Sequence, residues 1–205
     1  RLFMSRLLWD QPSERDYDSG LDRGVFYPAD GPAQIWNGLI SVEESPSEAE
    51  TRSRYLDGRK IGNHHGRGVF HANVEAYTYP EEISSRFGFT YRVTTAFGYK
   101  IHLVYNAIAV PSGRIFAHDE ATTFSWDIST RPILFEGQLH VSHIVIDTSV
   151  AYPETITALE DALYGSADGD AQLLSPSDIL QIFEDNSILQ IIDHGDGTDG
   201  PRQDR

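Results

Sequence analysis

The sequence of 205 residues contains no cysteine. This absence excludes disulfide bonds, thiolate zinc sites and a cysteine nucleophile, so packing alone must hold the fold together, as in a protein that folds inside a cell. The chain also has no apolar run long enough to span a bilayer, and Arg1 to Leu8 are too few and too charged for a secretory signal. We therefore expect a soluble, unsecreted protein without a membrane partner.

Basic residues are scarce as well. Sixteen Lys and Arg stand against 31 Asp and Glu, which gives a formal net charge of -15. This charge opposes binding to a nucleic-acid backbone or an anionic membrane by Coulomb repulsion, so we predict no tight DNA binding. The alternative is that the acidic surface only keeps the protein soluble.

Common catalytic motifs are missing too. The sequence has no Gly-x-Ser-x-Gly elbow, no Walker A loop and no dinucleotide-binding fingerprint between a strand and a helix. The adjacent pairs Glu43-Glu44 and Glu81-Glu82 are typical of solvated turns, because the two carboxylates of a glycosidase normally come from separate strands. We therefore predict that the protein is not an enzyme and needs no cofactor.

The histidines have no spacing typical of a metal site. His64, His65 and His71 lie in or beside a glycine-rich stretch, with no carboxylate or further histidine at a recurring offset. His140 and His143 are expected on opposite faces of one strand. These patterns favour surface histidines, and we predict no metal ion.

Alternation of apolar and polar residues predicts a chain built mainly from strands. Residues 74–110 are its centre, and we expect them to form a β-meander of three consecutive strands. Pro111-Ser112-Gly113 is expected to break the sheet after them. Further strands are predicted at residues 22–28, 35–43, 54–60, 69–79, 122–130 and 138–147, with an exposed loop at 62–68.

Two helices are predicted after the strands. Pro153 suits the first position of one helix and Gly165 its C-terminal cap, and Ser175 can cap a second helix that starts at Pro176. Residues 187–192 are expected to add an edge strand. From His194 onward, repeated glycine and aspartate predict a disordered tail.

Strands first and helices last predict a mainly β fold, a β-sandwich or barrel with one or two peripheral α-helices near the C-terminus. We divide the chain into an N-terminal arm (1–34), a β-sandwich domain (35–185) and a partly disordered C-terminal extension (186–205). Trp126 and Leu159 each occupy the apolar phase of their element. We expect both to be core residues that join the last strands to the first helix.

The aromatic residues leave a second function open. Trp9, Trp36 and Trp126, with ten tyrosines, could form the sugar-stacking platforms of a carbohydrate-binding module. However, Trp36 and Trp126 are in register with the aliphatic residues of their strands, which favours core packing.

Short motifs in a fixed order extend along nearly the whole chain, from about Trp9 to Phe183. They include Trp36-Asn37-Gly38-Leu39, Glu44-Ser45-Pro46-Ser47, Tyr55-Leu56-Asp57-Gly58, Glu75-Ala76-Tyr77-Thr78-Tyr79-Pro80-Glu81-Glu82, Gly98-Tyr99-Lys100-Ile101-His102-Leu103-Val104-Tyr105, Phe124-Ser125-Trp126 and Leu163-Tyr164-Gly165. In this order the chain resembles the major tail proteins, or tail tube proteins, of bacteriophages with long, non-contractile tails.

The resemblance implies a structural virion protein. Such subunits are β-sandwiches that assemble as hexameric rings, and the rings stack into a tail tube through which DNA passes. The implied location is the virion tail, assembled in the host cytoplasm. The implied partners are further copies of the chain and other tail proteins, such as the tape measure, terminator and tip proteins.

Two groups of residues are candidates for this function. The candidate lumen-facing acidic residues are Glu43, Glu44, Glu75, Glu81 and Glu82, which could equally only solvate outer loops. The candidate inter-subunit strand is Tyr99, Lys100, Ile101, His102, Leu103, Val104 and Tyr105. Two joints, at residues 83–86 and 93–97, are shorter than the loops of the family. This departure leaves a tail-tip or baseplate ring protein as the alternative.

Overall fold

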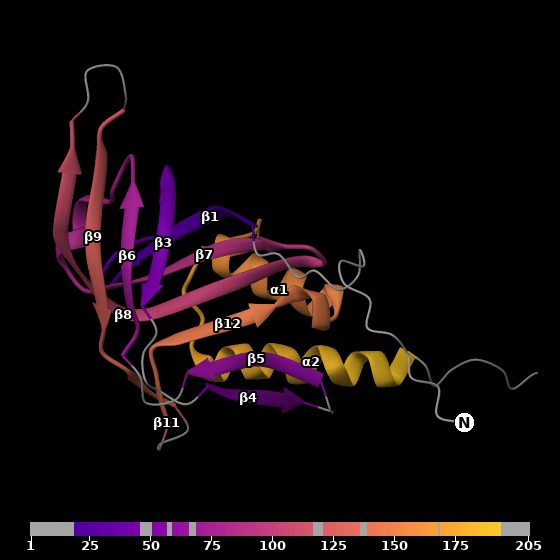
Figure 1. The fold of residues 1–205 in the computed structure, drawn as a ribbon. Helices are drawn as coiled ribbons and strands as arrows, with labels where there is room; N and C mark the ends of the chain where they lie inside the picture. The colour runs from indigo at the N-terminus through magenta and orange to yellow at the C-terminus, as the bar shows by residue number, and fades with distance from the viewer. Residues whose placement is uncertain are drawn as a thin grey trace, which may run out of the picture.

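The strand β8 (Gly98–Ile115), 18 residues long, runs through both halves of the fold and joins them (Figure 1). The computed structural model describes residues 19–45, 51–56, 59–65, 69–116, 121–135, 139–167 and 169–193. Within these residues, ten antiparallel strands form one sheet and two more form a separate pair. Two helices follow near the C-terminus, so the predicted mainly β fold is confirmed.

The elements follow one another in a simple order. The other strands are β1 (Ser19–Pro28), β2 (Gln34–Ile35), β3 (Leu39–Ser45), β4 (Thr51–Leu56), β5 (Arg59–His65), β6 (His71–Ala76), β7 (Phe87–Thr95), β9 (Thr123–Thr130), β10 (Ile133–Phe135), β11 (Leu139–Val141) and β12 (His143–Asp147). The helices are α1 (Pro153–Tyr164) and α2 (Pro176–Asp193), with short 3-10 helices η1 (Glu81–Ser84) and η2 (Thr148–Val150).

The large sheet has two sections that share β8. The central section has the strand order β2-β1-β7-β8-β12-β5-β4. The four-stranded section consists of β3, β6, β9 and the distal part of β8, residues 107–115. The change of partner occurs beside Asn106, which has a φ of 52° and whose amide donates a hydrogen bond to the Arg131 carbonyl at 3.0 Å. Asn is among the few non-glycine residues that tolerate this left-handed conformation.

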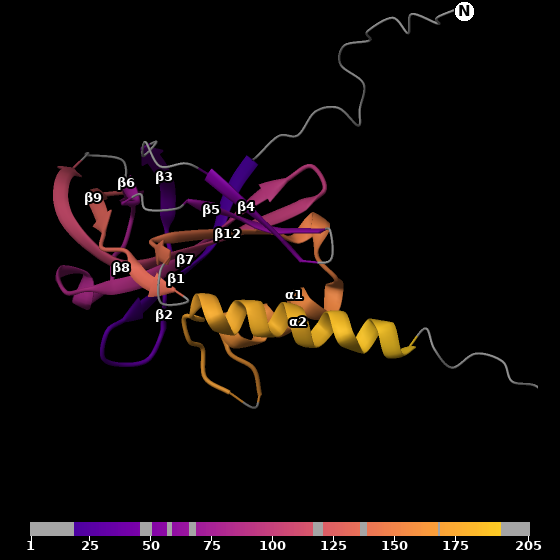
Figure 2. The same cartoon turned by 90° about the horizontal axis from the view of Figure 1, so that it is seen from below.

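Two hydrophobic clusters hold the fold together. One packs the central section against the four-stranded section and includes Trp36 and Trp126, whose ring centroids lie 6.1 Å apart. The other includes Ile101 and Leu159 and packs the central section against the helices, which lie together on one side of the sheet (Figure 2). Trp126 and Leu159 are both buried as predicted, but in different clusters. Leu159 does join the last strand, through Ile144 and Ile146, to the helix. The expectation that Trp126 takes part in this contact is wrong.

The helices have the predicted starts. Pro153 is the first residue of α1, which ends before Gly165, a glycine with a φ of 85°. Before α2, the Ser175 hydroxyl accepts a hydrogen bond from the Asp178 N–H, and the Asp178 carboxylate accepts one from the Ser175 N–H. This reciprocal pair satisfies two backbone donors that the helix cannot pair itself. Because α2 continues to Asp193, the predicted edge strand at 187–192 is instead helical.

Other predicted boundaries change as well. The arm predicted over residues 1–34 is part of the sheet from Ser19, since β1 pairs with both β2 and β7. The strand predicted at 35–43 is divided between β2 and β3 by a turn at Gly38, which has a φ of 78°. The loop predicted at 62–68 is strand as far as His65. Residues 1–18 and the predicted tail from His194 lie outside the described residues.

The predicted meander is wrong in its pairing. Strand β6 pairs with β3 and β9 rather than with β7, and only β7 and β8 are neighbours. Strand β8 also continues through Pro111, where a register shift against β9 accommodates the residues that were expected to end the sheet. The strand predicted at 138–147 is divided at Ser142 into β11 and β12, which pair in different sheets.

Candidate functional site

The outward face of the four-stranded section is polar and acidic. Glu43, Asn73 and Asp127 form one row across β3, β6 and β9, and Glu75 lies opposite Ser125 in a neighbouring row. Residues directly opposite in antiparallel strands share a face, and those two positions apart along a strand do so too. We call this surface the acidic face and define it by Glu43, Glu75 and Asp127. Two of the five predicted acidic residues, Glu43 and Glu75, therefore lie together.

Within the four described strands, no lysine or arginine lies on the acidic face. Among residues 39–45, 71–76, 107–115 and 123–130, all described, the single Lys or Arg is Arg114. Arg114 is opposite Phe124, which shares a face of β9 with buried Trp126 and not with Asp127. The Arg114 guanidinium lies 5.9 Å from the centroid of the Phe124 ring. Asn73 instead donates hydrogen bonds to the Asp127 carboxylate at 2.8 Å and to the Ser112 hydroxyl at 3.1 Å. The face thus presents carboxylates among uncharged polar groups.

The other three predicted acids lie elsewhere. Glu81 and Glu82 are exposed on η1, between β6 and β7, where the Glu82 carboxylate accepts a hydrogen bond from the Gln34 amide at 3.0 Å. Glu44 alternates with Glu43 along β3, so its side chain extends to the opposite face, toward Tyr91. The five acids predicted as one group are therefore divided among three environments.

Glu44 belongs to a cluster that also contains Tyr91, His102 and His143, which we call the histidine cluster. The Nδ1 atom of His102 lies 3.0 Å from Nε2 of His143 and 3.1 Å from Oε1 of Glu44. The Tyr91 hydroxyl donates a hydrogen bond to the same Glu44 oxygen, and the Tyr91 ring stacks on His102 with centroids 4.5 Å apart. One ligand atom each from Glu44, His102 and His143 lies within 4.8 Å of the others, so these residues could hold a metal ion.

Strand pairing explains how distant residues meet in this cluster. Tyr91 of β7 is directly opposite His102 of β8, and His143 of β12 is opposite Val104, two positions further along β8. Tyr91, His102 and His143 are therefore neighbours on the sheet face that packs toward the four-stranded section. The rings of His102 and His143 are buried, while 38% of the Glu44 side chain is exposed.

The electrostatics of the histidine cluster favour an ionised Glu44. Burial alone would raise the pKa of its carboxyl group, but the hydrogen bond with His102, the two imidazole rings and the Tyr91 hydroxyl together lower the pKa to about 2. The Tyr91 pKa shifts the other way, because burial and the adjacent Glu44 charge both disfavour a phenolate. A carboxylate and a neutral phenol are therefore the stable forms.

The predicted inter-subunit strand, Tyr99–Tyr105, lies inside the sheet. Its backbone pairs with β7 from Tyr99 to Val104 and with β12 from Lys100 to Val104. Both edges of this stretch are therefore used within the subunit, which contradicts the expectation that it pairs with another copy. Free edges occur elsewhere, because among the described strands β3 pairs only with β6 and residues 108–115 of β8 pair only with β9.

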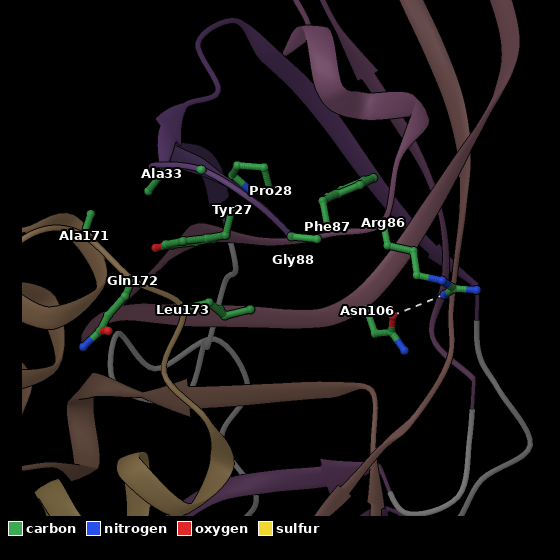
Figure 3. Close-up of a pocket in the computed structure, with 12 residues that line it drawn as sticks. Tyr27, Pro28, Ala33, Arg86, Phe87, Gly88, Asn106, Ala171, Gln172 and Leu173 are labelled. Carbon is green, nitrogen blue, oxygen red and sulfur yellow. Dashed lines mark hydrogen bonds between the residues drawn. The ribbon is translucent and has the colours of Figure 1, made fainter.

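An open pocket of about 380 Å³ lies beside β1, β7 and β8 (Figure 3). Its aromatic residues, Tyr27 and Phe87, are almost completely buried, and the Tyr27 hydroxyl donates a hydrogen bond to the Leu163 carbonyl at 2.6 Å. Arg86 donates a hydrogen bond to the Asn106 side chain at 3.2 Å. The described lining contains no carboxylate. With its rings buried, this pocket offers no platform on which a sugar could stack.

Sequence spacing could not reveal the histidine cluster. Its four members lie at positions 44, 91, 102 and 143, on four different strands, so no local motif connects them. The usable signal was His102, a polar residue between the apolar positions of a buried strand. The predicted candidates His64 and His65 lie in β5, where their side chains are outside the described part of the structure, and His71 is exposed on β6.

Comparisons with family models, with curated proteins and with solved structures gave no match. Within the described residues, no helix is both long enough and apolar enough to cross a membrane.

Proposed function

We propose that this protein is a structural subunit of a phage tail tube, and that the four-stranded section forms its inner wall. The observation that carries the proposal is the combination of an acidic face without cations and two free backbone edges in the same section. Unpaired edges are templates for pairing with another chain. The sequence resemblance to tail tube proteins supplies the biological context.

The strand directions suit a closed ring. Each neighbouring pair in the order β3-β6-β9-β8 is antiparallel, so β8 runs opposite to β3. Copies arranged around an axis along the strands would therefore place β8 of one beside β3 of the next in an antiparallel ladder. Such a head-to-tail contact generates rings when the rotation closes.

The expected dimensions suit a conduit. Six copies of a four-stranded section would supply roughly 24 strands, more than the 16 to 18 of barrels that enclose an aqueous channel. At a spacing of about 4.8 Å between strands, the backbone circle would be about 37 Å across before strand tilt widens it. A DNA duplex passes through such an opening.

The acidic face gives this wall a low affinity for DNA. Each lysine or arginine on a lumen would form a local ion pair with a passing phosphate. Glu43, Glu75 and Asp127 instead repel phosphates, and their uncharged neighbours leave no strong contact. The proposal assigns the protein no catalytic role.

Assembly can be tested at the edge of β8. Ile115 and Phe116 are 58% and 74% exposed at the end of this free edge, and the ladder would cover them. The test is light scattering and negative-stain electron microscopy of the wild type and of Ile115→Lys. We expect rings or tubes of the wild type and much smaller species of the variant.

The matched control is Leu134→Lys in the separate β10–β11 pair, where Leu134 is 67% exposed and is not part of the four-stranded section. This variant should assemble like the wild type. A wild type that stays monomeric at high concentration would contradict the proposal, as would an Ile115→Lys variant that assembles normally. Single rings without stacking would favour the tail-tip or baseplate alternative.

A further inference from the structure

We propose that Glu44, His102 and His143 form a binding site for a divalent transition-metal ion of the Zn²⁺ type. This inference does not depend on the proposed tail-tube function, and it replaces the sequence-based expectation of no metal ion. It rests on the donor atoms, on their spacing and on the hydrogen bonds that they cannot all make without a cation.

The three side chains supply the donor types that zinc prefers. Two imidazole nitrogens and one carboxylate oxygen converge, from β8, β12 and β3 respectively. Sites with three protein ligands of this kind hold Zn²⁺ and leave a fourth position to water. The exposed side of Glu44 gives solvent access to that position.

The spacing of the donor atoms fits a tetrahedral shell. Zinc bonds of about 2.0 to 2.1 Å place neighbouring ligand atoms about 3.3 to 3.4 Å apart. The distances of 3.0 Å between the two imidazole nitrogens and 3.1 Å between His102 and Glu44 are a few tenths of an ångström shorter. Small rotations of exposed Glu44 and of the rings would open the triangle around an ion.

Hydrogen bonds alone cannot satisfy the three polar atoms that meet at the centre of the histidine cluster. Nδ1 of His102 faces two neighbours, and a neutral imidazole nitrogen carries either one proton or one lone pair. If Nδ1 carries a proton, it can donate a good hydrogen bond to only one of Glu44 and His143. If it carries a lone pair, that lone pair points at the negative carboxylate of Glu44 and is repelled by it. A cation accepts a lone pair from all three atoms at once.

A second layer of contacts already orients these ligands. The Tyr91 hydroxyl donates to the Glu44 carboxylate, and the Tyr91 ring stacks against His102. On the other side, the Phe70 ring lies 4.6 Å from His143, centroid to centroid. Partners of this kind fix ligand orientation in metal sites, and their loss weakens metal binding by about 10- to 100-fold. An ion here would bind the free-edge strand β3 to the central section.

The test is calorimetric titration of the chelator-treated, dialysed full chain with Zn²⁺, together with Co²⁺ as a spectroscopic probe of tetrahedral geometry. We expect one ion per chain, a zinc-dependent rise in melting temperature and intense visible Co²⁺ absorption. In Glu44→Gln, which removes a ligand, the affinity should fall by more than the roughly 100-fold expected for a lost orienting contact, so the Co²⁺ bands and the thermal shift should disappear. Tyr91→Phe, which removes only an orienting hydrogen bond, should weaken binding by about 10-fold.

The controls are Glu43→Gln and His71→Gln, which remove the same side-chain types from the opposite, outward face of the four-stranded section. Both should bind zinc like the wild type. Circular dichroism establishes that each variant is folded before titration. The proposal is overturned if the wild type binds no zinc, or if Glu44→Gln binds zinc as tightly as the wild type does, because the ion then lies elsewhere.

Discussion

Arg92 holds the Asp22 carboxylate by two hydrogen bonds, from Nε to Oδ1 at 2.7 Å and from Nη2 to Oδ2 at 2.6 Å. The two residues are directly opposite in β7 and β1. The same guanidinium lies 4.4 Å from the centroid of the Tyr99 ring in β8. Arg92 therefore links three neighbouring strands on the helix side of the sheet, through a planar fork that lysine cannot reproduce.

Replacing Arg92 by lysine should lower the free energy of unfolding by about 1 kcal/mol, because solvent partly screens an ion pair whose Asp22 side chain is half exposed. The hydrogen bonds from Arg92 lower the pKa of Asp22. The stability from this shift is present above the ordinary aspartate pKa and is lost as pH falls through the lowered one. Urea unfolding at pH 7 and pH 3 should show that the free energy of unfolding falls less on acidification in Arg92→Lys than in the wild type. The control is Arg131→Lys at an exposed position. If the free energy of unfolding fell equally on acidification in both variants, Arg92 would not be the group that lowers the Asp22 pKa.

Trp126→Ala should cost about 3 to 5 kcal/mol and Leu159→Ala about 2 to 5 kcal/mol, because each leaves a cavity in a buried cluster. Since the two residues lie in different clusters, their effects should be independent. A double-mutant cycle with Trp126→Phe and Leu159→Ala should give a coupling below about 0.5 kcal/mol. Strong coupling would instead support a single continuous core.

Alkaline unfolding should depend on Tyr27. Burial raises the pKa of its hydroxyl group to about 12. Between pH 10 and 12 the unfolded chain releases this proton and the folded chain does not, so stability falls with rising pH. At about 1.4 kcal/mol per pKa unit, the loss is at most about 2.7 kcal/mol. Tyr27→Phe should be about 1 kcal/mol less stable at pH 7 but lose less at pH 12. Exposed Tyr77→Phe should keep the wild-type pH profile in denaturant melts, and an identical profile for Tyr27→Phe would refute the assignment.

The wild type should not retard duplex DNA in a gel-shift assay, even at low salt where electrostatic attraction is strongest. A triple variant, Glu43→Lys, Glu75→Lys and Asp127→Lys, should bind DNA, with an affinity that falls steeply as salt rises. The control carries three lysines at scattered exposed positions, Asp30, Asp161 and Asp185. Each triple variant changes the net charge by +6, from -15 to -9. Equal binding by both variants would show that total charge, and not the acidic face, governs DNA avoidance.

Alternation and capping residues were sufficient to predict most elements. The two-residue period located β6 and β9, which each have one buried and one more exposed face. It also located β7 and the first half of β8, because their residues alternate in polarity, although both faces of these two strands are buried. Proline at a first helical position and a following glycine located α1. Both signals depend only on residues that are close together in the sequence, so they can be recognised without knowing which elements pack together.

The wrong or missing predictions have causes that lie outside the local sequence. Strand β5 has few apolar residues, but its backbone still pairs with β4 and β12, and backbone pairing needs no apolar side chain. Pro111 stays in a strand because it occupies a free-edge segment with a bulge, one of the positions where proline is tolerated. The histidine cluster depends on which strands become neighbours, and strand order is a property of topology that periodicity does not contain.

The pairing of β5 with β12 cannot form until the ribosome has made β12. Strand β5 ends at His65, and its partner β12 begins at His143, 78 residues later. At about 5 to 20 residues per second, a ribosome needs roughly 4 to 16 s to make that interval. During this time the β4–β5 hairpin is complete but has no β12 to pair with. Neighbouring nascent chains on one mRNA expose the same unpaired edge of β5. The speed at which residues 66–142 are translated therefore influences whether β5 pairs with β12 of its own chain or with a neighbouring chain.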